Sequence, residues 1–163
     1  MAVDMFLKLD GIKGESKDAK HKDEIHIESF SWNFKQPYDV HGGGMATGKL
    51  QVNALKINKY VDASSPDLLL CISNGKHIKE GLITVRKAGE HPVEYLKIKL
   101  TQILITELDY QGQSEADGEE ELMEVVSLMF SSYHVAYQEQ GKDGKPSGSP
   151  KEMGWDLKAN AKL

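Results

Sequence analysis

The chain has 163 residues, of which 39% are hydrophobic, and its formal net charge is −5. This length predicts one domain over 1–163 with a core of its own. With one arginine and a pI near 5.7, the chain lacks the basic surface that nucleic acid requires. The longest uncharged apolar run, 68–72, is far too short to span a membrane. We therefore expect no nucleic acid among its partners and no membrane insertion.

The single cysteine, Cys71, has no partner for an internal disulfide, so the composition is typical of a protein that folds in a reducing compartment. The opening residues, MAVDMFLKLDGIKGE, carry no basic region, apolar core or small-residue cleavage site. They therefore predict no cleaved signal peptide, and export would require a dedicated machine.

The first third of the chain alternates apolar and polar residues, as strands do. A short strand is expected over 6–9, closing on a glycine turn at 11–14, and a longer one over 24–35. In the longer segment the apolar residues change parity between Ile27 and Phe30, which predicts a bulge near Glu28 and Ser29. Strands that bend in this way favour a barrel.

The glycine-rich stretch HGGGMATGKL, residues 41–50, overlaps two catalytic motifs. The spacing from Gly43 to Lys49 fits a phosphate-binding loop, but Leu50 stands where that loop needs a hydroxyl, and a strand pattern follows instead of a helix. His41 and the three glycines resemble an esterase oxyanion loop, yet no G-x-S-x-G pentapeptide supplies a nucleophile. We predict an extended loop over 36–48, no catalytic residue and no enzyme activity.

One helix is expected, over about 65–75. Ser65 is suited to cap it, Pro66 to occupy its first position and Gly75 to end it. Cys71 lies in its apolar part and is predicted to be buried. Two long strand segments follow, over 93–110 and 122–137, with apolar residues on both faces. Such strands need cover on both sides, which suggests oligomerisation. The segment 141–150 is rich in Gly, Ser and Pro and is predicted to be flexible.

The sequence predicts no metal site and no cofactor. Its six histidines are scattered, and none is spaced with a cysteine or carboxylate in a ligand pattern, so we expect surface or loop histidines. The acidic stretch 113–124 places Glu115, Asp117, Gly118 and Glu124 at calcium-loop positions, but it begins with Gln113 and strands flank it, so an acidic solvated loop is expected. Trp32 and Trp155 are predicted to anchor a core or an interface.

Several longer stretches together resemble one family. They are MAVDMFLKLDGIKGES, HKDEIHIESFSW, GKLQVNALKINKYVDASSPDLLLCISNGKHI, RKAG, VEYLKIKLTQILIT and GWDLKAN. In this order, over nearly the whole chain, they are similar to the haemolysin-coregulated protein (Hcp) family, the tube proteins of the bacterial type VI secretion system.

The resemblance implies a small, mainly β barrel of two packed antiparallel sheets with one short helix at its side. It also implies a homo-hexameric ring that stacks into a hollow tube and is exported with a spike protein by a contractile sheath. Effector proteins would travel in the lumen. The protein would be cytoplasmic before firing and then secreted. A related alternative is an Hcp-like chaperone or adaptor that binds one effector.

The resemblance and the strand parity together predict two surfaces. If Phe30, Trp32 and Phe34 point inward, Ser31 and Asn33 face outward, and we predict that they line the lumen. The family's extended loop, which projects towards the neighbouring ring, falls on 36–48. Its predicted ring-stacking residues are Tyr38, Asp39, Val40, His41, Gly42, Gly43, Gly44 and Met45.

Overall fold

The computed structural model describes residues 2–41, 46–114 and 120–163. Within these residues the chain forms fourteen strands and one helix. Their bounds are β1 (Val3–Leu9), β2 (Ile25–Ile27), β3 (Ser29–Ser31), β4 (Phe34–Lys35), β5 (Tyr38–Asp39), β6 (Ala46–Thr47), β7 (Gln51–Val52), β8 (Leu55–Tyr60), α1 (Ser65–Asn74), β9 (Ile78–Lys87), β10 (Glu94–Ser114), β11 (Glu120–Met129), β12 (Ser132–Tyr137), β13 (Lys151–Asp156) and β14 (Ala161–Lys162).

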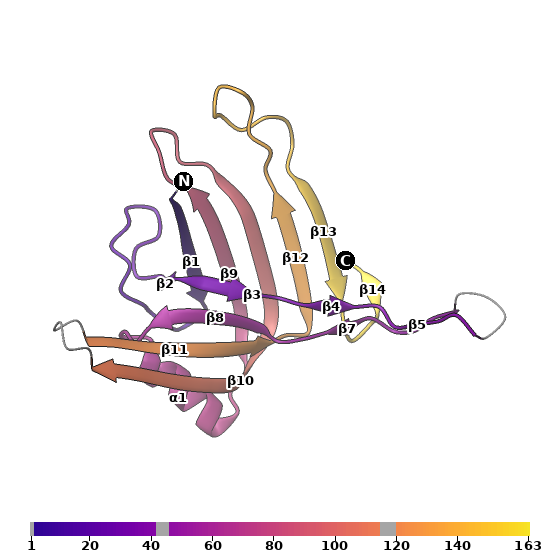
Figure 1. Ribbon diagram of the computed structural model, residues 1–163, viewed down its shortest axis with the longest axis horizontal. Coiled ribbons are helices and arrows are strands. Elements are labelled where there is room, and N and C mark those ends of the chain that lie inside the picture. Colours follow the sequence, from indigo (N-terminus) through magenta and orange to yellow (C-terminus); the bar gives the residue numbers. More distant parts are fainter. Residues whose placement is uncertain (1, 42–45, 115–119) are drawn as a thin grey trace.

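The strands form two antiparallel sheets that share β10 (Figure 1). The large sheet runs β2-β1-β9-β10-β12-β13-β14, and the small sheet runs β10-β11-β8-β3. The mainly β fold with a single helix confirms the prediction. The barrel part of that prediction needs correction, because in the described residues the two packed sheets stay open. The strands β12, β13 and β14 extend the large sheet beyond the small one.

The strand β10 passes from one sheet to the other. It pairs with β9 as far as Ile103 and with β11 from Leu104 onward. The change of direction coincides with a positive φ of 51° at Gln102 and a register shift after Ile105. Because each half turns a different face to the core, this long strand is apolar on both faces, as its sequence suggests.

The second long segment is not one strand, which corrects the prediction of a strand over 122–137. The strand β11 ends at Met129 and β12 begins at Ser132. The intervening Ser131 donates its backbone N–H to the Thr101 carbonyl at 2.9 Å. The chain therefore turns here from the small sheet into the large one, beside the bend of β10.

The other local predictions agree well with the structure. The parity change at Glu28 separates β2 from β3, and the short strand at the N-terminus is β1. The helix packs Leu68 and Cys71 into the core, and Gly75 ends it at φ 68°. The capping prediction was wrong, because Ser65 is the first helical residue and Ser64 is the N-cap.

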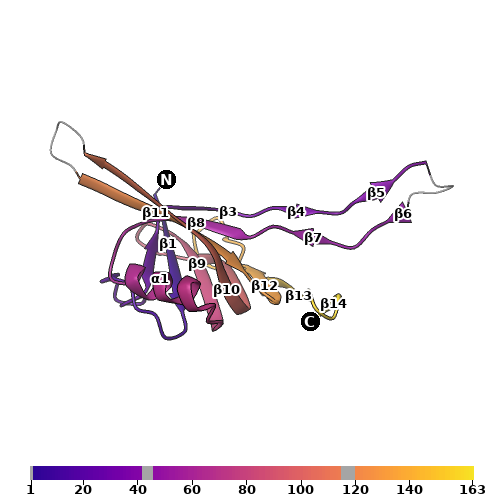
Figure 2. The ribbon, with the colours of Figure 1, turned by 90° about the horizontal axis from the view of Figure 1, so that it is seen from below.

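A two-stranded arm, described over residues 34–41 and 46–52, projects from the body (Figure 2). Two short ladders build it: Phe34 pairs with Val52, and Tyr38 pairs with Thr47. Between them the Gly48 N–H donates to the Pro37 carbonyl at 2.9 Å, and a Cβ at position 48 would lie 2.8 Å from the Pro37 ring. A glycine is therefore required at position 48, opposite Pro37.

Candidate functional site: surfaces for assembly

The arm presents apolar side chains to solvent. Tyr38 is 70% exposed and Val40 is 60% exposed. The Asp39 carboxylate accepts the His41 backbone N–H at 2.9 Å, which shapes the turn leading to the tip. Of the predicted stacking residues, Tyr38 to His41 thus lie on the outer part of the arm, whereas Gly42 to Met45 lie outside the described residues. Exposed aromatic and branched side chains on a thin ribbon indicate a contact surface.

An aromatic cluster anchors the arm to the body. The Trp32 ring lies 4.4 Å from that of Phe34 and 5.3 Å from that of Tyr133, and Phe130 contacts Trp32 and Tyr133 edge-on. Trp32 packs against the core as predicted, and so does Trp155. Phe34 points to the same side but is 41% exposed, because it belongs to the arm rather than the body. Aromatic packing of this kind fixes where the arm leaves the sheet.

The outer face of the small sheet is polar along β3 and the part of β8 beside it. Ser31 and Asn33 are both exposed, and the Asn53 side-chain amide donates to the Asn33 carbonyl oxygen at 3.1 Å. On the same face, the Asn58 amide donates to the Ser29 hydroxyl at 2.8 Å. Both edges of this sheet are open in the described part of the chain, since β3 pairs with β8 alone and β10 beyond Ile103 pairs with β11 alone.

Behind the small sheet, a buried ion pair joins it to the helix. Lys59 and Glu124 are both 0% exposed and contact each other directly. The Lys59 ammonium also donates to Asp62 at 3.0 Å, and the Ser65 hydroxyl donates to Glu124 at 2.7 Å. The alternation of residues along β8 could have predicted the burial of Lys59, because Lys59 follows Leu55 and Ile57 on the inward face.

A second charged cluster holds the loop 14–24 on the large sheet. His21 lies in a loop, as predicted for the histidines, but it is buried there and contacts Glu24 and, at 2.7 Å, Glu94. Burial tends to raise the pKa of Glu94, but hydrogen bonds from His21 and Lys97 outweigh it and lower that pKa. No local sequence pattern connects Glu94 with a histidine 73 residues away.

Arg86 forms the other half of this attachment. Its guanidinium donates two hydrogen bonds to Asp18, at 3.0 and 2.6 Å, and one to Asp4 at 3.1 Å. The hydrogen bond from Arg86 holds the pKa of Asp18 well below its ordinary value. Arg86 also lies over the Phe6 ring, on which His21 stacks. These charged groups have a structural role, because they attach the loop 14–24 to the large sheet.

Within the described residues, none of the catalytic or metal-binding sites considered from the sequence is formed, and Glu115, Asp117 and Gly118 of the calcium-loop pattern lie outside those residues. The residue Glu124, at the last calcium-loop position, is turned into the core against Lys59. Strands β7 and β8 follow the glycine stretch, where a phosphate-binding loop needs a helix. Among the described residues no three His, Cys, Asp or Glu side chains gather as metal ligands. The one helix found in the described chain is too short to cross a membrane.

The comparisons with known proteins agree with this arrangement of sheets, helix and arm. Residues 6–137 match the family model described as type VI secretion system effector, Hcp. The chain is 42% identical to protein hcp1 of Pseudomonas aeruginosa, over 98% of each chain. It superimposes on the crystal structure of Hcp1 from Salmonella typhimurium with a TM-score of 0.78 and 34% identity, covering 100% of both chains. A structure described as a type six secretion system protein gives a TM-score of 0.93 at 25% identity, covering 99% of this chain and 100% of its own.

Fold and sequence together define the class, a secreted protein of the type VI secretion system. Within that class, the chain belongs to the Hcp family. Members of this family are tube proteins and not enzymes, which fits a molecule whose notable features are open sheet edges and a projecting arm.

Proposed function

We propose that this chain is the subunit of a type VI inner tube, in which six copies form a ring and the rings stack into a hollow tube. In this proposal the protein waits in the bacterial cytoplasm, and a contractile sheath then drives the tube out with the spike protein. Effector proteins travel in the lumen.

The observation that carries the proposal is the pair of open edges on the small sheet. An unpaired edge strand offers a row of backbone donors and acceptors, which proteins cover, shorten or pair. Here β3 of one copy is free to pair with β10 of the next. Because the two edges differ, the contact is heterologous, and a rotation that completes a circle closes it into a ring.

Pairing of this kind would place the outer face of the small sheet, with its polar part along β3, on one continuous surface. Ser31 and Asn33 lie on that face, opposite the side that packs against the core. A lumen that must release its cargo is better served by small polar groups than by an apolar surface, which would hold unfolded or exposed apolar segments. We assign Ser31 and Asn33 to the lumen, and Tyr38 to Met45 to the contact between rings.

Mass photometry of the purified protein over a range of concentrations and ionic strengths tests this function. A dominant particle of six 18.1 kDa chains is the expected result. A monomer that persists at every concentration would instead favour the chaperone or adaptor, a single chain that binds one effector.

A further inference from the structure

The loop 14–24 lies on the face of the large sheet that is turned away from the core. The backbone hydrogen bonds found within the loop close it on itself. Two of its side chains reach the sheet: Asp18 accepts hydrogen bonds from Arg86 of β9, and His21 contacts Glu94 of β10. An arginine stays charged at every pH a protein tolerates, so a response to pH near neutrality must come from the His21 end.

Both ring nitrogens of His21 face carboxylate groups. Its Nε2 lies 2.7 Å from the Glu94 Oε1, and its Nδ1 contacts the Glu24 Oε2. The His21 and Glu24 side chains are only 9% and 10% exposed, so water does not replace the contact between them. An ionised carboxylate only accepts hydrogen bonds, and a neutral imidazole has a single N–H to donate. The three side chains therefore hold one proton more than a neutral imidazole beside two carboxylates.

The extra proton belongs on the Nδ1 of His21. Burial raises the pKa of Glu94, but hydrogen bonds from His21 and Lys97 outweigh burial and lower that pKa, so Glu94 is ionised at neutral pH and accepts the Nε2 proton. Between Nδ1 and Glu24, the imidazole is the stronger base, because a histidine has an ordinary pKa of about 6.5 and a glutamate one of about 4.3. His21 is therefore an imidazolium that donates to both glutamates.

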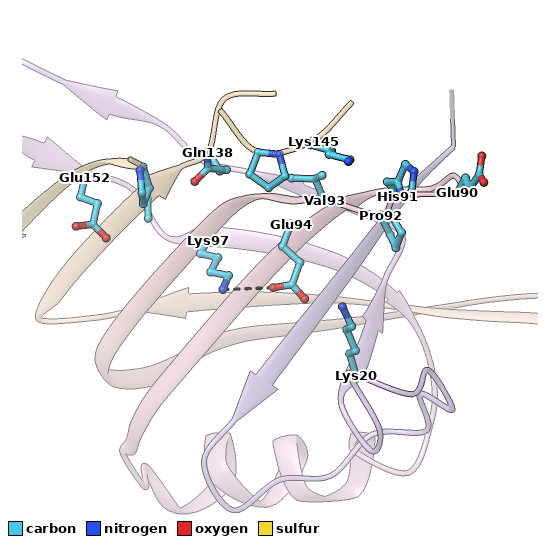
Figure 3. A pocket seen from close by; sticks show the side chains of 13 residues that line it. Lys20, Glu90, His91, Pro92, Val93, Glu94, Lys97, Gln138, Lys145 and Glu152 are labelled. Atoms are coloured by element: carbon cyan, nitrogen blue, oxygen red, sulfur yellow. Dashed lines mark ion pairs between the residues drawn. The ribbon is translucent and has the colours of Figure 1, made fainter. Parts of the chain in front are cut away.

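The other charges near the imidazole are exposed or already paired. The hollow beside it is lined by four exposed lysines, Lys8 of β1, Lys20 and Lys22 of the loop, and Lys97 of β10. The Lys97 ammonium lies 3.3 Å from a Glu94 oxygen (Figure 3). Arg86 is bonded to Asp18 and Asp4. Water screens exposed lysines strongly, so the two carboxylates in direct contact decide the charge of the ring.

We infer that His21, Glu24 and Glu94 form a proton-dependent attachment, the His21 latch, which holds the loop 14–24 on the sheet and opens when the proton on Nδ1 is lost. With one N–H left, the ring donates either to Glu24 within the loop or to Glu94 of the sheet, and its lone pair faces the other carboxylate. That repulsion separates this end of the loop from β10. All three residues belong to one subunit, so the inference does not rest on the proposed tube function.

Opening of the latch uncovers one aromatic side chain. The Phe6 ring is 3% exposed and lies under the His21 ring, with 4.4 Å between the ring centroids. The Asp18 end of the loop stays bonded to Arg86, so the loop swings out at one end only. An unfolded histidine gives up its second proton above about pH 6.5. The stabilisation by the latch is thus fully present below that pH, and it is lost as the pH rises to the point where the folded ring gives up its proton.

NMR of the full chain labelled with ¹⁵N-histidine tests the proton. The variant His21→Gln identifies the His21 signals by their loss. At about pH 7.5 we expect both ring nitrogens of His21 to be protonated, although a free histidine is mostly neutral there. The variant His26→Gln, which removes an exposed histidine 3.7 Å from Glu28, should leave these signals unchanged. A His21 ring with an unprotonated nitrogen at this pH would overturn the inference.

Hydrogen exchange tests the opening of the loop. Between about pH 6 and about pH 9.5, after correction for the intrinsic rate, the protection of 14–24 should fall at least about tenfold as the His21 ring loses its proton, while β9 stays protected. The variant Glu94→Gln keeps an acceptor for Nε2 but removes one carboxylate, so its loop should open at least about one pH unit lower. Glu80→Gln, which removes a half-exposed carboxylate beside Lys99, is the matched control and should not shift the opening. A loop that stays protected after the ring is neutral, or equal opening of Glu94→Gln and the unaltered protein, would refute the latch.

Discussion

Replacing Lys59 by methionine should strongly destabilise the fold, because it leaves the Glu124 carboxylate buried without its cation. Both side chains are 0% exposed, so solvent does not compensate for the lost charge. Breaking a buried pair in this way costs about 3–5 kcal/mol. The Ser65 hydroxyl, which donates to Glu124 at 2.7 Å, remains in place. We therefore expect Lys59→Met to lower the free energy of unfolding by about 3 kcal/mol, at the lower end of that range.

The double variant Lys59→Met with Glu124→Leu removes both fully buried charges and fills their space with apolar side chains; Asp62 loses the Lys59 ammonium in both variants, so its contribution cancels in the comparison. Apolar replacement of a whole buried pair is often neutral or stabilising, so the double variant should be at least about 2 kcal/mol more stable than Lys59→Met alone. Urea unfolding at fixed protein concentration measures both differences, since assembly makes stability depend on concentration. A Lys59→Met loss below about 1 kcal/mol, or a double variant less stable than the single one, would refute this reasoning.

Three further predictions concern assembly and acid stability. Deletion of Tyr38 to Met45 should leave six-chain rings intact in mass photometry while fewer tubes appear in electron micrographs, because the arm is assigned to stacking. Cysteines at Ser31 and Asn33 should resist a bulky maleimide in assembled tubes, because they face the lumen. Asp18→Asn should make stability less sensitive to acid. Because the hydrogen bond from Arg86 lowers the folded-state pKa of Asp18, that stabilisation is present above its unfolded pKa of about 3.9 and is lost as the pH falls.

Each of these predictions has a contradicting outcome, and the labelling and acid-stability predictions also have a matched control. Loss of the rings after the arm deletion would assign the arm to the ring instead. A cysteine at Leu70 should react fully in the same tubes, and equal reaction at Ser31 would place that residue outside the lumen. For acid stability the control is the exposed Asp10, changed to asparagine and followed by urea unfolding from about pH 6 to about pH 3. Identical pH profiles for Asp18→Asn and the unaltered protein would remove Asp18 from the explanation.

Much of the fold was predictable because its signals are local. Alternation located β1 and β8, the parity change after Ile27 located the break between β2 and β3, and Pro66 with Gly75 located α1. The break at Ser131 was missed, since the apolar residues that flank Ser131 and Ser132 on either side resemble one long strand. Its cause is the contact of Ser131 with Thr101, 30 residues away.

The ion pairs that attach the loop 14–24 to the large sheet show more clearly what a single sequence does not predict. His21 becomes buried because Glu94 arrives from a distant strand, and Asp18 finds Arg86 across 68 residues. No periodic pattern in the sequence predicts either of these two pairings. Openness of the sheets is also non-local, because it depends on whether the edge strands of the two sheets pair with each other. The buried ion pair of Lys59 could have been predicted, because its position on the inward face of β8 requires a buried partner of opposite charge.

Cryo-electron microscopy of the assembled protein tests the central claim most directly. The tube account predicts rings of six copies in which β3 of each subunit pairs with β10 of its neighbour and Ser31 and Asn33 face a hollow centre. Rings of another symmetry, or six copies joined with the small sheet turned outward, would contradict it.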